Sequence, residues 1–147
     1  MSGGTLIALA ADEIVLDEFS MLGPIDPEII GLPAASIVKA RDSKVIGEVS
    51  DLTLVLADMG EKALAQLKRG AVELLTPRLE QSKADALAAK LTSGQWTHDY
   101  ALTAEEAKEF GLPVKVGMPS EVMALMQFYP QPVQQSGVDF LRLTPAR

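Results

Sequence analysis

Residues 2–16 read SGGTLIALAADEIVL, and this stretch decides which fold the rest of the chain must complete. One serine and two glycines run directly into Thr5–Ala11, a segment that is apolar on nearly every helical face. A helix of that composition is typical of a position buried on all sides. Residues 13–16 then predict a short strand. The chain therefore opens on a helix that needs partners, with no strand in front of it.

The middle of the chain is predicted to be helical. A long helix begins near Lys44 or Ser50 and runs to about Leu75, because apolar residues recur at spacings of three and four. Pro77 fits the first position of a second helix, which Gly94 ends. The apolar stripe of the long helix consists of Leu52, Val55, Leu56, Met59, Ala63 and Leu67.

Shorter elements are predicted on either side of these helices. Residues 22–27 are extended, because residues before proline avoid the helical region, and residues 31–35 continue as an irregular loop. The sequence Thr103-Ala104-Glu105-Glu106 is a capping box that opens a helix, and Gly111 ends it. The remaining predictions are a strand over residues 114–116, a helix over residues 119–128 and a loosely held tail over residues 130–147.

Helices that alternate with short strands indicate an α/β fold. Two or three strands are too few for a sheet that could cover these helices, and the buried first helix needs partners as well. We therefore expect an incomplete domain over residues 1–129, followed by the tail of residues 130–147.

Composition excludes several classes of function. The chain has 147 residues, of which 48% are hydrophobic, and it has no cysteine. Disulfides, thiolate metal sites and a cysteine nucleophile are therefore excluded. The net charge of −7 disfavours nucleic-acid binding, which needs clustered lysine and arginine. No apolar run is long enough to cross a membrane, and no G-x-G-x-x-G follows a strand, so neither a span nor a cofactor is expected.

Two segments, SGGTLIALAADEIVLDEFSMLGPIDPEI and SGQWTHDYALTAEEAKEFGLPV, resemble the serine dehydrogenase proteinase family. That family is related to signal peptide peptidase A and to the proteolytic subunit of Clp. The resemblance implies a Clp/crotonase-like fold, in which ββα units wind into a superhelix, and it implies assembly into rings or dimers. It also implies an N-terminal half, often with a membrane anchor, that this sequence lacks. Localisation stays open, because relatives are membrane-associated and this sequence reads as soluble.

The resemblance assigns the nucleophile to Ser2. A hydroxyl at a helix N-terminus lies at the positive end of the helix dipole, which favours a developing oxyanion. The amide of Gly3 could donate one hydrogen bond to that oxyanion, and in the family the second donor comes from the absent half. Two other interpretations remain open. Ser2 could be a plain helix cap, or, after removal of Met1, its own α-amine could act as the base.

A serine nucleophile needs a base. His98 is followed by Asp99, but neighbouring side chains of an extended segment point to opposite faces, so a structural role for His98 is favoured over a catalytic or metal-binding one. The resemblance favours a Ser-Lys dyad, with Lys44 as the base and Lys39 as the second choice. Such a lysine must be buried, because desolvation favours the neutral amine. The alternative is a solvated lysine in a charged loop.

These observations predict a serine peptidase of the Ser-Lys type that has little activity as this chain alone. Its partners would be a peptide or protein substrate and further copies of the chain. A non-catalytic interaction fragment of the same fold is the alternative. An acyl-CoA enzyme on the same fold is a third hypothesis, but the resemblance lies on the peptidase side.

Overall fold

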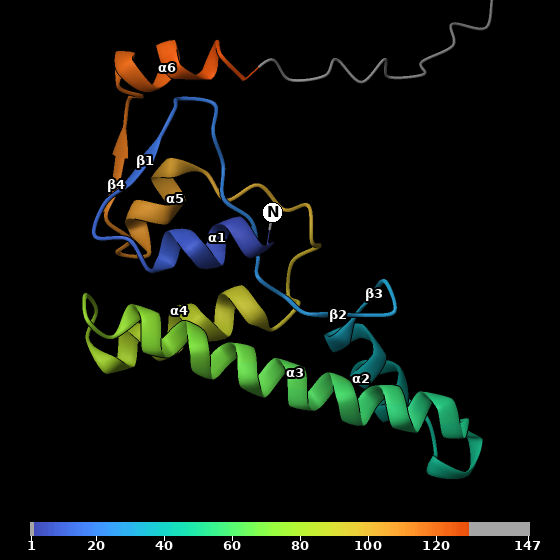
Figure 1. Ribbon diagram of the computed structural model, residues 1–147. Helices are drawn as coiled ribbons and strands as arrows, with labels where there is room; N and C mark the ends of the chain where they lie inside the picture. The colour runs from blue at the N-terminus through green and yellow to red at the C-terminus, as the bar shows by residue number, and fades with distance from the viewer. Residues whose placement is uncertain (1, 130–147) are drawn as a thin grey trace, which may run out of the picture. The chain divides into compact units, whose positions relative to one another are not determined.

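The computed structural model describes residues 2–129, with side chains from Gly3 onward (Figure 1). The chain divides into two compact units, residues 1–117 and residues 118–147. The described part of the second unit contains one helix, α6 (Ser120–Met126). The predicted tail over residues 130–147 lies outside the described residues.

The first unit is a helix-rich α/β structure. Its helices are α1 (Ser2–Leu9), α2 (Ala34–Asp42), α3 (Asp51–Leu75), α4 (Gln81–Thr92) and α5 (Ala104–Glu109), with a 3₁₀ turn at Ile46–Glu48. Its strands are β1 (Ile14–Leu16), β2 (Glu28–Ile29), β3 (Leu32–Pro33) and β4 (Val114–Val116).

The strands form two small pairs. β1 and β4 are parallel, with Ile14 opposite Val114. β2 and β3 form an antiparallel hairpin whose turn residues, Ile30 and Gly31, have φ angles of 50° and 78°. Two positive φ angles in a two-residue turn match the twist of a tight hairpin. The strand pairs are small, as predicted, and the packing is dominated by helices.

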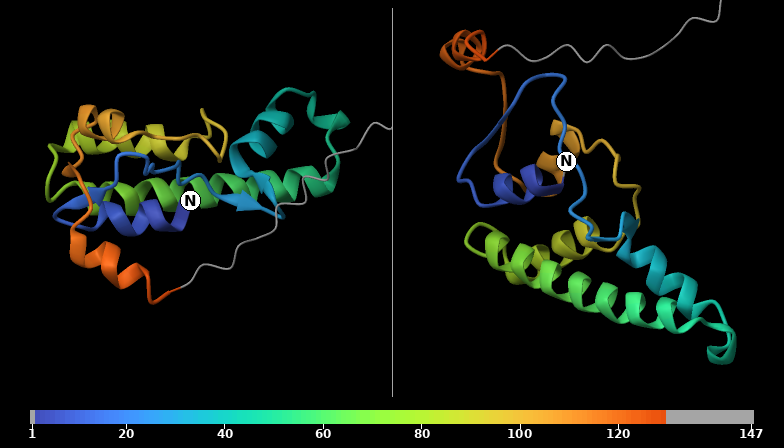
Figure 2. Two further views of the ribbon diagram at one scale, coloured as in Figure 1. Left: turned by 90° about the horizontal axis from the view of Figure 1, so that it is seen from above. Right: turned by 45° about the vertical axis from the view of Figure 1, so that its right-hand side comes forward.

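Three helices pack against α3. In Figures 1 and 2, α2 lies along the N-terminal half of α3, whereas α1 lies beside its C-terminal half. α4 also packs against α3. The core contains Leu9, Ile14, Leu16, Leu22, Ile25, Ala71, Leu75, Ala84, Leu87, Ala88, Leu91, Leu102, Ala104, Ala107 and Leu112.

Several local signals are confirmed. The side chain of Ser50 caps α3 by accepting a hydrogen bond from the Thr53 amide. Both hydrogen bonds of the predicted capping box at Thr103 are present. Gly94 and Gly111 follow α4 and α5 with φ angles of 66° and 85°. These signals are local, so the sequence carries them without knowledge of the tertiary fold.

The predicted stripe of α3 is wrong in its N-terminal half. Leu52, Val55 and Met59 are exposed, and the side that faces α2 contains Ala57 and Gly60 instead. A Cβ at Gly60 would lie 3.3 Å from the carbonyl oxygen of Ala34. Small residues therefore set this contact because they let the two helix backbones approach closely.

Three further predictions are wrong. α1 is not buried on all sides, because Thr5 and Leu9 are covered while Ile7 is 77% exposed. The predicted loop over residues 31–35 contains β3 and the first residues of α2. Pro77 does not begin α4, since α3 ends at Leu75 and α4 begins at Gln81.

Candidate active site

The N-terminal end of α1 is fixed by a buried hydroxyl. Thr5 is 2% exposed, and its Oγ1 accepts a hydrogen bond of 3.0 Å from the amide of Gly23. Because Thr5 lies three residues after Ser2, the two positions share one side of the helix. The segment around Gly23 therefore contacts α1 on the side of the helix that carries Thr5.

The other end of α1 is held by Arg78, from the turn between α3 and α4. Its guanidinium donates to the carbonyl oxygens of Leu9 at 3.4 Å and Ala10 at 2.9 Å, and to Asp12 Oδ1 at 2.8 Å. The last carbonyls of a helix have no donor inside the helix itself, so a cation placed there satisfies them and also complements the helix dipole. α1 is thus anchored at both ends.

The glycines in the first turn of α1 have no described atom packed against them. Gly3 and Gly4 are exposed, and a Cβ built on either would meet no atom within 4 Å among the described residues. The first amides of a helix have no acceptor inside it, so they can donate to a bound group. Ser2 is the first residue of α1, and its side chain lies outside the described part of the structure.

His98 has a partner that lies far away in the sequence. Its Nδ1 lies 3.0 Å from Oδ1 of Asp26, whose side chain is only 2% exposed. The other carboxylate oxygen of Asp26 is buried and has no hydrogen-bond partner among the described residues. The His98 ring is 35% exposed, so the pair joins a buried carboxylate to an imidazole that solvent can reach.

This pair was missed by sequence reasoning, which weighed His98 only with Asp99. A hydrogen bond from the Thr97 side chain lowers the pKa of Asp99, which is exposed. Asp26 lies between Ile25 and Pro27, in the segment that was expected to be extended. The signal that could have indicated it is a carboxylate placed between apolar residues and prolines, since a buried charge needs a partner.

The segment that carries His98 is also held by an aromatic stack and by a hydrogen bond to α5. The rings of Trp96 and Tyr100 stack with a centroid distance of 4.6 Å, and the Tyr100 hydroxyl donates to Glu106 at 2.7 Å. That hydrogen bond, together with the Thr103 amide, lowers the pKa of Glu106. Both ends of the His98 segment are therefore tied to packed elements.

The structure does not bring the two candidate lysines to α1. Lys39 lies on α2, and Lys44 follows α2 before the 3₁₀ turn. Both side chains are exposed, so the described residues do not supply the desolvation that a lysine base requires. α2 lies along the opposite half of α3 from α1, as the two views of Figure 2 show. None of the helices between residues 2 and 129 has the length and apolarity to cross a bilayer.

Comparison with known proteins adds to this geometry. A family model described as ClpP-like SDH-type serine proteinase matches residues 1–147. The chain belongs to this family. A ClpP-like serine proteinase acts by nucleophilic attack of a serine on a peptide bond.

Two relatives of this ClpP-like chain come from Methanocaldococcus jannaschii. The uncharacterized protein MJ0137 is 51% identical over 142 residues, which cover 96% of this chain and 50% of the relative. The uncharacterized protein MJ1495 is 50% identical over 134 residues, which cover 90% of this chain and 45% of the relative. The chain thus spans about half the length of the curated relatives it matches. No solved structure matches it.

Proposed function

We propose that this chain forms the nucleophile-bearing part of a serine endopeptidase that uses a Ser-Lys dyad, as in peptidases similar to signal peptide peptidase A. The observation that supports it most is the first turn of α1. Ser2 and Gly3 occupy that turn, a Cβ built on Gly3 or Gly4 would meet no described atom within 4 Å, and Thr5 and Arg78 hold the helix in place.

In this proposal Ser2 Oγ attacks the carbonyl carbon of the scissile peptide bond. The base, Lys44 or in second place Lys39, takes the hydroxyl proton, and the Gly3 amide donates to the oxyanion. The protonated lysine then gives its proton to the leaving amine. Water hydrolyses the acyl-serine by the same steps, which restores the free hydroxyl.

We further propose that residues outside this chain complete the site. Lys39 and Lys44 are exposed and lie away from α1, so an active site needs additional structure to bury one of them beside Ser2. The matched relatives are about twice as long as the chain, and their unmatched part could supply that cover together with a second oxyanion donor. In this view the 147-residue chain is an incomplete ββα superhelix with little activity by itself.

A peptide-hydrolysis assay tests the proposal. The 147-residue chain is compared with the same chain joined to the part of MJ0137 that it does not match. We expect no hydrolysis from the chain alone and measurable hydrolysis from the joined protein. Ser2→Ala should then reduce the rate by about 10³-fold or more, and Lys44→Ala by about 10²-fold or more.

Lys39→Ala is the matched control, since it removes a lysine that is also exposed. Full activity of the joined Ser2→Ala protein would contradict Ser2 as the nucleophile. If Lys39→Ala abolishes activity and Lys44→Ala does not, then Lys39 is the base instead of Lys44. The exposure of both lysines also favours a second candidate, a non-catalytic interaction fragment of the same fold, and inactivity of the joined protein would support it.

A further inference from the structure

A hollow between α4 and the end of α5 has a lining that combines apolar groups with charges of both signs. Its volume is about 280 Å³, which is close to the lower limit of ligand pockets and suits a molecule of the size of a single amino acid. We name it the α4–α5 hollow, and its lining consists of Lys83, Ala86, Leu87, Lys90, Glu109 and Phe110.

Two of the lining residues are large and apolar. Leu87 is 5% exposed and belongs to the core, so packing fixes its position. The ring of Phe110 packs against the same core and stacks with Trp96 at a centroid distance of 6.5 Å. An apolar group that enters the hollow therefore meets a surface that is already held in place.

Lys90 brings a positive charge to the hollow in a defined position. Its Nζ lies 4.2 Å from the centroid of the Phe110 ring, a distance at which an ammonium is attracted to the face of an aromatic ring. Lys83 lies about two helical turns earlier on α4, so it is on the same side of the helix. Neither lysine takes part in an ion pair with another described residue.

Glu109 brings the opposite charge. It precedes Phe110 in the sequence, it is exposed, and it too has no ion pair within the part of the chain that the structure describes. Ammonium groups and a carboxylate thus line one hollow without bonding to each other. This arrangement is complementary to a small ligand that carries both charges.

We propose that the α4–α5 hollow binds a free α-amino acid with a large apolar side chain, such as leucine. At neutral pH such a ligand carries a carboxylate and an ammonium on the same carbon atom. Lys90 binds the carboxylate, and Glu109 binds the ammonium. The side chain of the ligand lies against Leu87 and Phe110. This binding is independent of the role proposed for Ser2, because no residue of α1 takes part in it.

The C-terminal residue of a peptide is the competing ligand, since it also has a side chain and a carboxylate on one carbon atom. Its nitrogen belongs to a peptide bond, so it carries no charge for Glu109 to bind. The presence of Glu109 in the lining is therefore the reason for choosing a free amino acid.

A nuclear magnetic resonance titration of the 147-residue chain with leucine tests the proposal. We expect saturable shifts of the amide resonances around Leu87, Lys90 and Phe110 at millimolar leucine, because a ligand of this size binds weakly. Leucinamide lacks the carboxylate, N-acetyl-leucine lacks the ammonium and glycine lacks the side chain. Each of the three should bind about tenfold or more weakly than leucine.

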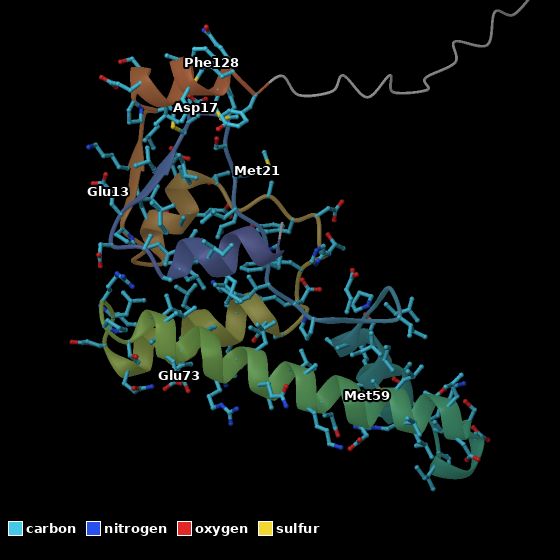
Figure 3. All side chains as sticks on the ribbon, in the orientation of Figure 1. Glu13, Asp17, Met21, Met59, Glu73 and Phe128 are labelled. Carbon is cyan, nitrogen blue, oxygen red and sulfur yellow. The ribbon has the colours of Figure 1, made fainter. Side chains whose placement is uncertain are left out.

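Two variants test the assigned contacts. Lys90→Met keeps the length of the side chain and removes its charge, and Glu109→Gln keeps the shape and removes the charge. Each should weaken leucine binding by about tenfold or more. Lys68→Met is the matched control, because Lys68 lines a different hollow, the one between α3 and α4 that contains Glu73, which Figure 3 labels. This control should bind leucine as the unchanged chain does.

Melting temperatures check that the variants are folded. Glu109 is exposed, so Glu109→Gln should melt like the unchanged chain even if Lys90→Met is destabilised by the loss of its contact with Phe110. Absence of saturable shifts with leucine in the unchanged chain would overturn the proposal. Undiminished binding by the Glu109→Gln protein would overturn it too. Equally tight binding of N-acetyl-leucine would overturn it in favour of the C-terminal residue of a peptide.

Discussion

The bond between His98 and Asp26 should contribute strongly to stability, and His98→Ala is the change that tests it. The bond is 3.0 Å long, it joins segments 72 residues apart, and the Asp26 side chain is 2% exposed. Oδ2 of Asp26 has no hydrogen-bond partner among the described residues. The variant removes the hydrogen bond from His98 to Oδ1 and leaves this carboxylate buried without it. We expect a loss of about 1.5–3 kcal/mol in the free energy of unfolding.

Urea denaturation measures this loss. With an m-value of about 1–3 kcal/mol/M, the midpoint should fall by roughly 1 M. Asp26→Asn keeps the shape of the side chain and removes its charge, so it should cost less than His98→Ala. A double-mutant cycle over the two positions should give a coupling energy of about 1–3 kcal/mol.

Asp99→Asn is the matched control, because Asp99 is adjacent to His98 and exposed. It should change the free energy of unfolding by less than about 0.5 kcal/mol. If His98→Ala costs no more than this control, or if the cycle shows no coupling, then the His98–Asp26 bond does not hold the two segments together and the reasoning is refuted.

Three further predictions follow from single positions. Leu9→Ala should cost about 2–5 kcal/mol, because Leu9 is 2% exposed in the core, whereas Ser2→Ala should cost at most about 1 kcal/mol; equal urea midpoints would contradict this. Gly94→Ala should cost about 1–3 kcal/mol, because φ is 66° and the new Cβ would lie 2.6 Å from the Cβ of Ala35; an unchanged melting temperature would show that the turn relaxes. The hydrogen bond from the Tyr100 hydroxyl lowers the pKa of Glu106 from 4.5. The stabilisation of the fold by the Glu106 carboxylate is therefore present above about pH 4.5 and is lost as the pH falls through the lower pKa of the folded state. Glu106→Gln should reduce this loss of stability in acid, which a pH series of melting curves measures.

The parts of the fold that sequence reasoning predicted are those with local causes. Ser50 and Thr103 cap helices through their own side chains, and Gly94 and Gly111 end helices through their positive φ angles. Each of these effects depends on residues within about one helical turn. The bounds of α5 followed closely from its capping box and from Gly111, whereas the start of α3 was left open between Lys44 and Ser50, and α3 begins at Asp51.

The errors have tertiary causes. The side of α3 that packs on α2 is built from Ala57 and Gly60, which a search for large apolar residues passes over. The exposed Leu52 and Val55 then looked like the core stripe. Periodicity finds an apolar face, but it cannot tell a face that packs inside the chain from one that stays exposed.

The candidate site also has a part that the sequence predicts and a part that depends on the tertiary fold. The position of Ser2 at the start of α1 was readable from the two glycines and the apolar segment that follows. The pairing of His98 with Asp26 was not, because a contact across 72 residues depends on how the chain folds back. For the same reason, spacing alone could not tell that Lys39 and Lys44 both lie away from α1 within the described residues.

The central claim is that Ser2 is the nucleophile of a serine peptidase, and covalent labelling tests it most directly. A fluorophosphonate probe is added to the chain joined to the unmatched part of MJ0137, and the modified residue is located by mass spectrometry of the digested protein. We predict one phosphonylated serine, Ser2, with no labelling in the Ser2→Ala protein and none in either protein after heat denaturation. Labelling of another serine, or undiminished labelling of the Ser2→Ala protein, would contradict the claim.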